Sequence, residues 1–389
     1  MPAAEPPKTF CPNCRRFLIP SEIFWSCWQP LTEDQLRSRK TDDEDSKAWD
    51  MTSQEGDDDD GFQWELKCCY TLNNNQAKEC SSCGKNRATE ESRNACQYCG
   101  SELPAFLEGL DPSTITVTGP SGAGKSHYIV ALHEWWSTYL GDIGLSHFSA
   151  MGHRTEAAFE KMRSMVVDHK KVLPATVKNR MISFSWQILP PAAFNKPGIL
   201  ITLPDVSGER LYDVRALNEN RHYRHAGGII FLLDADRFGY GASSGTRVRP
   251  AADHMRVANA MIQDMRSRLS QQEWTDIPIA VCVNKVDTLL GDPHWDNIIN
   301  RIIPQHEGGF DLAACNARSH AIRETLWQSP ASRPIVNLMD NNFVQVKYFG
   351  VATLGGMADS GKDVDLSPIS VEDPFLWLLY ARGYISAKP

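Results

Sequence analysis

The sequence of 389 residues lacks any apolar run long enough to cross a bilayer. Its longest apolar runs, Gly228 to Leu233 and Phe375 to Tyr380, fall far short of the ~20 residues that a membrane-spanning helix needs. The N-terminus has no basic region followed by an apolar stretch, so we expect no secretory signal. Inspection finds no internal repeat. These absences together favour a cytoplasmic protein of two or three domains without a membrane span.

The chain also lacks an excess of basic residues, because its formal net charge is −8. Residues 41–61 hold ten acidic residues and one lysine, a charge of −9, which leaves the remainder at +1. Few apolar residues occur in this stretch, which predicts a solvated acidic insertion. The sequence therefore gives no electrostatic support for binding of nucleic acid by the body of the protein.

Cysteine is scarce beyond residue 100, where only Cys282 and Cys315 occur among the eleven in the chain. Because the cytosol keeps thiols reduced, the nine earlier cysteines favour metal binding over disulfides. They include three CxxC pairs: Cys11 and Cys14, Cys80 and Cys83, and Cys96 and Cys99. Two such pairs close one tetrahedral four-thiolate site, so we predict a structural Zn²⁺ site in this segment.

The sequence pattern alone leaves open which of these cysteine pairs share a zinc ion. The pair at Cys80 and Cys83 can share one ion with the pair at Cys96 and Cys99. A zinc-ribbon module of this kind either binds a protein or a nucleic acid, or has the structural role of stabilising a small fold. We favour the structural role, because the segment is too polar to build a core of its own.

A change in composition between Leu103 and Pro112 predicts two domains, a cysteine-rich module at 1–109 and a second domain at 113–389. In the second domain, short β-branched runs alternate with helical patterns, which indicates an α/β fold with a mostly parallel sheet. The predicted strands are Ser113 to Thr118, Arg180 to Gln187, Ile199 to Leu203, Gly228 to Asp234, Ile277 to Asn284 and Val344 to Ala352. The predicted helices are Lys125 to Tyr139, Glu209 to Arg224, Ala251 to Ser270, pieces of Asp292 to Trp327, and Asp373 to Tyr384.

A complete phosphate-binding loop separates the first of these strands from the first helix. It consists of Gly119, Pro120, Ser121, Gly122, Ala123, Gly124, Lys125 and Ser126. The glycines let successive backbone N–H groups converge on a phosphate at a helix N-terminus. In such a loop the lysine reaches the β- and γ-phosphate oxygens and the serine hydroxyl ligates Mg²⁺.

A base-reading signature follows the buried strand that ends near residue 284. It comprises Asn284, Lys285 and, after one valine, Asp287. The aspartate can accept two hydrogen bonds from the N1 and N2 groups of guanine, which adenine does not present in that arrangement. Its position after a strand, about 160 residues beyond the phosphate loop, favours guanine recognition.

A third signature, between the other two, predicts a switch that senses the γ-phosphate. Asp205 ends an apolar strand and would hold Mg²⁺ through its water shell, while the backbone N–H of Gly208 would contact the γ-phosphate. A threonine that closes over the metal should lie between Ser126 and Asp205. We favour Thr176 for this role, with Thr155 as the alternative.

A strand that runs into a glycine-containing turn near residue 352 supplies the last signature. Its backbone can donate an N–H to the guanine O6, which makes Ala352 and Thr353 candidate base contacts.

Taken together, these segments resemble the translation-factor and Ras-like superclass of GTPases over residues 113 to 389. The cysteine pairs ahead of the phosphate loop, and the segments ITLPDVSGE, HAGGIIFLLDADR and DPFLWLLY, are similar to bacterial double-GTPase families of conflict-associated systems. The resemblance implies a six-stranded sheet with one antiparallel strand. It also implies Mg²⁺-dependent binding of GTP and GDP, and an effector role beside a companion GTPase.

The resemblance bears on two further sets of residues. The family pattern favours one zinc site from Cys11, Cys14, Cys96 and Cys99, which leaves Cys80 and Cys83 to pair with Cys68, Cys69 or Cys27. Where many relatives place Gln or His to orient the attacking water, this chain has Glu209. Its carboxylate can hold a water, but it would also bring negative charge toward the γ-phosphate, so its role in hydrolysis stays open.

The function that these residues favour is a GTP-hydrolysing molecular switch. Its catalytic residues would be Lys125, Ser126, Thr176, Asp205, Gly208 and Glu209, with slow intrinsic turnover. Arg154, Arg180 and Arg210 read better as surface residues than as an arginine finger. The alternatives are a GTP-binding adaptor that does not hydrolyse its ligand, and a nucleic-acid-binding zinc protein with a regulatory GTPase domain.

Overall fold

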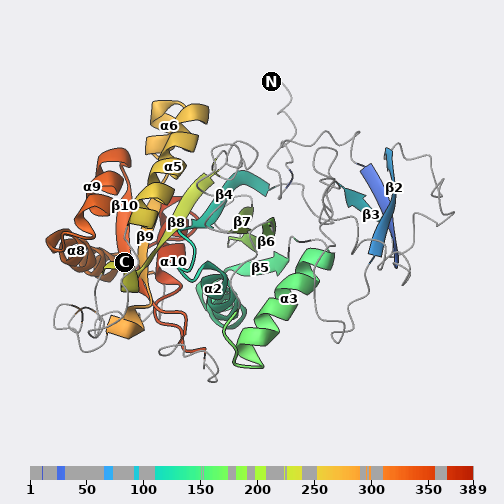
Figure 1. Cartoon of the computed structure of the whole chain (residues 1–389), viewed down its shortest axis with the longest axis horizontal. Coiled ribbons are helices and arrows are strands. Elements are labelled where there is room, and N and C mark those ends of the chain that lie inside the picture. Colours follow the sequence, from blue (N-terminus) through green and yellow to red (C-terminus); the bar gives the residue numbers. More distant parts are fainter. Residues whose placement is uncertain are drawn as a thin grey trace. The chain divides into compact units, whose positions relative to one another are not determined.

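Figure 1 shows the computed structural model of the chain. It describes Cys11 and residues 24–30, 65–72, 92–95, 110–149, 151, 153–173, 181–190, 198–206, 223, 226–238, 252–289, 295, 298, 310–354 and 366–388. Contacts between residues divide the chain into two compact units, Met1–Glu108 and Gly109–Pro389. In these described residues no helix is both long and apolar enough to cross a membrane.

The first unit contains a three-stranded antiparallel sheet in the order β2-β1-β3. Its strands are β1 (Phe24–Pro30), β2 (Glu65–Leu72) and β3 (Ser92–Ala95). The register places Cys27 of β1 opposite Cys69 of β2, next to Cys68. Cys27 and Cys69, two of the three cysteines that we considered as partners for Cys80 and Cys83, are therefore neighbours on adjacent strands.

The second unit is built on a seven-stranded mixed sheet in the order β10-β9-β8-β4-β7-β6-β5. Its strands are β4 (Leu110–Thr118), β5 (Ser146–Ser149), β6 (Met181–Leu189), β7 (Gly198–Val206), β8 (Ala226–Asp234), β9 (Ile279–Asn284) and β10 (Val346–Val351). The five strands from β10 to β7 are parallel, and β6 runs antiparallel to both of its neighbours.

The expectation of six strands is wrong by one. All six predicted strands are present, and the single antiparallel strand is confirmed as β6. The seventh strand, β5, is only four residues long and pairs with the outer side of β6. Its sequence, Ser-His-Phe-Ser, contains no β-branched residue, and three of its four side chains are exposed, so no strand pattern marks it.

Seven α-helices, one of them only five residues long, flank this sheet in the described part of the second unit. They are α2 (Lys125–Tyr139), α3 (His153–Val167), α5 (Ala252–Arg268), α6 (Gln271–Thr275), α8 (Leu312–Gln328), α9 (Arg333–Asn342) and α10 (Asp373–Ala381). The short 3₁₀ segments η2 (Leu140–Ile143), η5 (Ala235–Phe238) and η6 (Val286–Leu289) follow α2, β8 and β9.

The bounds of α2 agree with the prediction, and α5 and α10 lie within their predicted ranges. The helices α3, α6 and α9 were not predicted. The helix α3 occupies part of the interval in which we sought the first switch. The predicted helix at Glu209 to Arg224 lies outside the described residues.

Both faces of the central strands are buried, as their continuous apolar sequences require. In β8, Ile229, Phe231 and Leu233 pack in the core layer that contains α5 and α9. The intervening Ile230 and Leu232 pack in the opposite layer, with α2 and α10. The alternation follows from the two-residue period of a strand, and it fixes the direction in which each strand end presents its last side chain.

The helix α3 is anchored to the sheet by aromatic rings and to α2 by one ion pair. Phe159 of α3 packs edge-on against Trp186 of β6, with ring centroids 4.8 Å apart. Arg163 of α3 binds Glu134 of α2 through two hydrogen bonds, from Nε at 2.6 Å and from Nη2 at 3.1 Å. Bonds from His133 and Arg163 lower the pKa of Glu134 to about 2, against the cost of its partial burial.

We predict that Glu134→Gln lowers the free energy of unfolding by about 1 kcal/mol at pH 7, because a charge-assisted bidentate pair between two helices is lost. The matched control is Glu160→Gln, since Glu160 is more exposed and lies 3.7 Å from Arg163. Urea denaturation measures both. Because the pKa of Glu134 is lowered in the folded state, its contribution is complete above its ordinary value of 4.5 and declines as the pH falls toward 2. Equal losses in the two variants at pH 7 would contradict the prediction.

Candidate functional site

The five parallel strands end at one edge of the sheet, and β7 brings the backbone of Asp205 to this edge. The phosphate loop follows β4, Asp234 ends β8, Asn284 ends β9 and Ala352 follows β10. The register places Asn284 beside Asp234 on one side and beside Val351 on the other. This is the carboxyl edge of the sheet, where ligands of open α/β sheets bind.

The phosphate loop wraps around the ammonium group of its own lysine. Lys125 begins α2 and is 8% exposed. Its Nζ donates to the carbonyl oxygens of Gly119 and Pro120, both at 3.0 Å. The amide of Ala123 closes a turn by donating to the Pro120 carbonyl at 3.3 Å. The loop therefore holds one buried cation at the N-terminus of a helix, where the helix dipole also favours an anion.

Asn284 joins the base-reading signature to the phosphate loop. Its Nδ2 donates to the carbonyl of Ala123 at 2.8 Å, and its Oδ1 accepts from the amide of Lys285 at 2.9 Å. The side chain is fully buried, so both polar ends need partners. Gly124, beside Ala123, has φ +81°, and a Cβ at this position would collide with the Asn284 amide group.

Lys285 and Asp287 follow in a tight turn that opens η6. Lys285 has φ +66°, a backbone conformation that non-glycine residues rarely adopt. Its Nζ forms ion pairs with Asp234 Oδ1 at 3.0 Å and with Asp236 Oδ2 at 3.3 Å. Thr288 Oγ1 donates to the Lys285 carbonyl at 2.7 Å. These contacts hold in place the loop that carries the half-buried Asp287.

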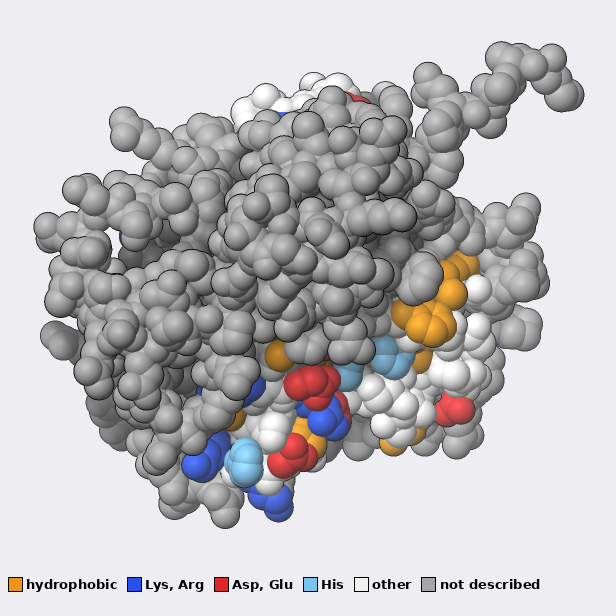
Figure 2. Space-filling view, turned by 90° about the vertical axis from the view of Figure 1, so that its right-hand side faces the viewer, with side chains coloured by type: hydrophobic (Ala, Val, Ile, Leu, Met, Phe, Trp, Pro, Cys, Tyr) orange, Lys and Arg blue, Asp and Glu red, His pale blue; other side chains and the backbone are white. Residues whose placement is uncertain are grey.

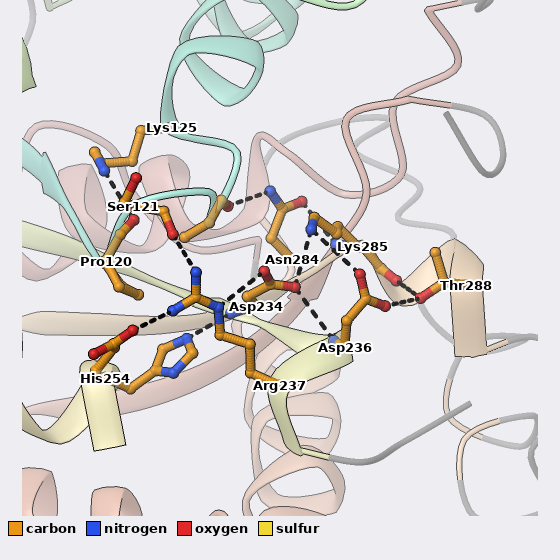
Figure 3. Close-up of polar contacts among 12 residues, drawn as sticks. Pro120, Ser121, Lys125, Asp234, Asp236, Arg237, His254, Asn284, Lys285 and Thr288 are labelled. Carbon is orange, nitrogen blue, oxygen red and sulfur yellow. Dashed lines mark hydrogen bonds and ion pairs between the residues drawn. The ribbon is translucent and has the colours of Figure 1, made fainter. Parts of the chain in front are cut away.

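Figure 3 shows that a second buried cation, Arg237, also contacts the phosphate loop. Its Nη2 donates to the carbonyl of Ser121 at 2.6 Å, and its Nη1 pairs with Asp253 Oδ2 at 3.0 Å. Sequence reasoning considered three other arginines and missed this one. The available signal was a cluster of charged residues, Asp234 to Arg237, directly after a strand buried on both faces.

His127, in the first turn of α2, is hydrogen-bonded to the segment that follows α3. Its Nε2 accepts a hydrogen bond from the amide of Leu173 at 3.0 Å. Burial, together with the nearby charge of Lys285, lowers the pKa of His127 to about 4. The ring is therefore neutral at pH 7, which is the state in which Nε2 can accept.

The last signature consists of Ala352 and Thr353, which we predicted as backbone contacts to a guanine base. Ala352 and Thr353 are buried at the end of β10. The amide of Ala352 donates to the carbonyl of Ile369 at 3.0 Å, and Ile369 donates back at 2.8 Å. This pair uses the Ala352 amide, which leaves the Thr353 amide as the candidate for the predicted contact to guanine O6.

Other predicted site residues lie outside the described part of the chain. They are Thr176, Gly208 and Glu209, and the side chain of Asp205, whose backbone belongs to β7. Thr155, the alternative to Thr176, lies in the first turn of α3. Ser126 is half-buried in the first turn of α2.

The predicted zinc ligands mostly fall outside the described residues as well. Cys11 is described and is fully buried. Nothing is described of Cys14, Cys80, Cys83, Cys96 and Cys99, and Cys68 is placed only by its position in β2. Among the residues that the structure does describe, no group of three or more metal-ligating side chains occurs.

We predict that Gly124→Ala lowers the free energy of unfolding by about 1–3 kcal/mol. The added Cβ must occupy a left-handed backbone conformation and displace the Asn284 amide. Gly141→Ala is the control, because a Cβ at that position meets nothing within 4 Å, and its effect should stay within about 0.5 kcal/mol. Guanidinium denaturation checks both variants, and equal effects would contradict the geometry described for Asn284.

Two solved structures have a distant likeness to this chain. Among solved structures, a similar chain is the Arl6 BBS3 small GTPase from Trypanosoma brucei with the bound nucleotide analogue GppNp. It is 13% identical, with a TM-score of 0.28, and the match covers 70% of this chain and 99% of that one. Another is sup35 complexed with GDP, 12% identical with a TM-score of 0.23, covering 62% of this chain and 36% of that one.

These two likenesses are too distant to carry an argument, and no curated protein matches the sequence. The family model for Double-GTPase 2, in contrast, matches residues 113–328, which span more than half of the chain and include the phosphate loop, the ends of β8 and β9, and the base-reading signature. The chain therefore belongs to the Double-GTPase 2 family.

Proposed function

We propose that this protein binds GTP and hydrolyses it to GDP and phosphate, and that it acts as a molecular switch. The observation that carries the proposal is the hydrogen bond between Asn284 and the phosphate loop. It places a guanine-reading signature and a phosphate-binding loop at one edge of the sheet, at a fixed spacing, although they lie 161 residues apart in the sequence.

The phosphate loop fits the diphosphate part of a nucleotide. Gly124 carries no side chain, so the backbone there can approach a ligand closely. The Lys125 ammonium is already held by two carbonyls of the loop, which orients it without neutralising its charge. It can then neutralise the charge that develops on the β- and γ-phosphate oxygens during hydrolysis.

Guanine specificity would come from the turn after β9. The Asp287 carboxylate would accept from the N1 and N2 groups of guanine, and the Thr353 amide would donate to O6. Adenine has neither the N1 proton nor O6, so it would leave these polar groups without partners, which is the usual source of strong discrimination.

Ser126 fits the role of a ligand for Mg²⁺, because its hydroxyl lies at the start of α2, directly after the lysine. Asp205 would act through the water shell of the metal, and Thr176 would complete the coordination. When bound, Mg²⁺ supplies positive charge to the phosphate oxygens. In the GTP form we propose that Thr176 and residues 205–215 become ordered, with Gly208 at the γ-phosphate and Glu209 near the attacking water.

We further propose that the protein works with a companion GTPase or a protein effector, in a bacterial conflict or defence system. The family description as a double GTPase and the sequence resemblance support this partner. On the face shown in Figure 2, acidic and basic side chains are intermixed over the described surface, which favours a protein partner over nucleic acid.

Nucleotide competition tests the central proposal. Purified protein should bind labelled GTP and release phosphate slowly in the presence of Mg²⁺, and excess ATP should not displace the label. Lys125→Ala should lower the affinity for GTP by about 100-fold, because a charge-assisted contact to phosphate is lost. Asp287→Ala should abolish the preference for GTP over ATP while the protein stays folded.

Lys171→Ala is the matched control for Lys125→Ala, because Lys171 is an exposed lysine and should be neutral. Absence of GTP and GDP binding in calorimetry would contradict the proposed function. Tight binding of GTP with no release of phosphate, alone and with Mg²⁺, would contradict hydrolysis and identify a binding adaptor.

For the first unit we propose a structural zinc site formed by its CxxC pairs. Plasma mass spectrometry of the purified chain should find one or two zinc atoms per molecule, and Cys96→Ser should lower this number by one. Cys282→Ser, which changes a buried cysteine of the second unit, should leave the zinc content unchanged. Metal-free protein that keeps the circular dichroism of the native chain would contradict a structural role.

A further inference from the structure

A short acidic and basic turn at the end of β8 contacts both loops of the candidate site. We name residues 234–237 the DADR turn, after their sequence Asp-Ala-Asp-Arg. The turn lies between the phosphate loop and the loop after β9, because β8 is flanked by β4 and β9 in the sheet. Figure 3 shows its side chains reaching in both directions. These residues end the segment HAGGIIFLLDADR, but the sequence signatures assign them no role.

Toward the phosphate loop, the turn acts through Arg237. The guanidinium is 5% exposed and donates to the Ser121 carbonyl at 2.6 Å. A Cβ on Gly122 would lie 3.5 Å from Nη2, so the guanidinium lies directly beside the loop. The arginine is itself held by Asp253 at the start of α5, at 3.0 Å, and by Asp234, at 3.5 Å.

The contact with Ser121 determines where a neighbouring amide points. The peptide group between Ser121 and Gly122 is planar and trans, so its N–H is directed opposite to its carbonyl. Because Arg237 holds the carbonyl of this peptide, it also holds the Gly122 N–H facing away from the guanidinium. Gly122 belongs to the loop whose amides would receive the phosphates.

Toward the base-reading loop, the turn acts through its two aspartates. Asp234 and Asp236 bind the Lys285 ammonium, and Asp236 also accepts from Thr288 Oγ1 at 3.3 Å. The amide of Asp236 donates to Asp234 Oδ1 at 3.2 Å, which keeps the two carboxylates in one arrangement. One rigid turn thus contacts both loops.

We propose that Arg237 is a positioning residue that orients the amides of the phosphate loop, and that the DADR turn sets the spacing between that loop and the base-reading loop. This inference rests on the proposed binding of guanine nucleotides. Arg237 acts through the loop backbone rather than on the phosphate, because its guanidinium is occupied by the Ser121 carbonyl and by Asp253. It is therefore distinct from an arginine finger.

The test compares Arg237→Gln and Arg237→Lys with Arg256→Gln in the full chain. Arg256 is the matched control because it is 64% exposed and lies 3.7 Å from the same Asp253. The first readout is amide hydrogen exchange of a peptide covering residues 119–126 in nucleotide-free protein. We expect exchange in Arg237→Gln to be at least about tenfold faster than in wild type, since a charge-assisted hydrogen bond is lost.

The second readout is the affinity for N-methylanthraniloyl-GDP and its displacement by GTP and by ATP. Arg237→Gln should weaken binding by about 10- to 100-fold, while the preference for GTP over ATP should persist because Asp287 is unchanged. Arg237→Lys keeps a buried cation but lacks the fork that reaches Ser121 and Asp253 together, so both readouts should be intermediate.

Exchange and affinity within twofold of wild type in both Arg237 variants would overturn the inference. So would a loss of GTP preference as large as the loss of affinity, which indicates general disruption rather than positioning. If wild-type protein binds no guanine nucleotide, the proposed function is wrong. The exchange readout in nucleotide-free protein still decides whether Arg237 orders the loop.

Discussion

The hydrogen bond from Asn284 to the carbonyl of Ala123 is the constraint on which the rest of the site depends. It crosses from the end of β9 to the phosphate loop beyond β4, and β8 lies between these strands. Because the donor is fully buried, its loss would leave polar groups without water or a partner. The parallel strands bring the loops to one edge, and this bond then fixes one loop against the other.

The charges at this edge are arranged so that every described cation lies beside an oxygen acceptor. Lys125 has two carbonyls, Arg237 has a carbonyl and two carboxylates, and Lys285 has two carboxylates. Removing buried charges from water is costly unless each is paired. Lys125 contacts two neutral carbonyls of the phosphate loop, whereas Arg237 and Lys285 contact carboxylates.

Much of this fold followed from the sequence, because buried parallel strands carry continuous apolar runs and the phosphate loop marks the start of α2. The helices α3, α6 and α9 did not follow, and neither did β5. β5 is short, lacks β-branched residues and is mostly exposed, so no strand pattern marks it. The loops of the site were predictable as local patterns. The contacts of Arg237 with Ser121 and of Asn284 with Ala123 were not, because they join residues more than a hundred positions apart and depend on strand register.

The seventh strand has a consequence for how this molecule can associate. One lateral boundary of the sheet is β5, which offers the unpaired backbone groups of only four residues. A foreign strand that added itself there would gain few main-chain hydrogen bonds, which limits both accidental aggregation and docking by sheet extension. Recognition at this end of the domain must instead use side chains.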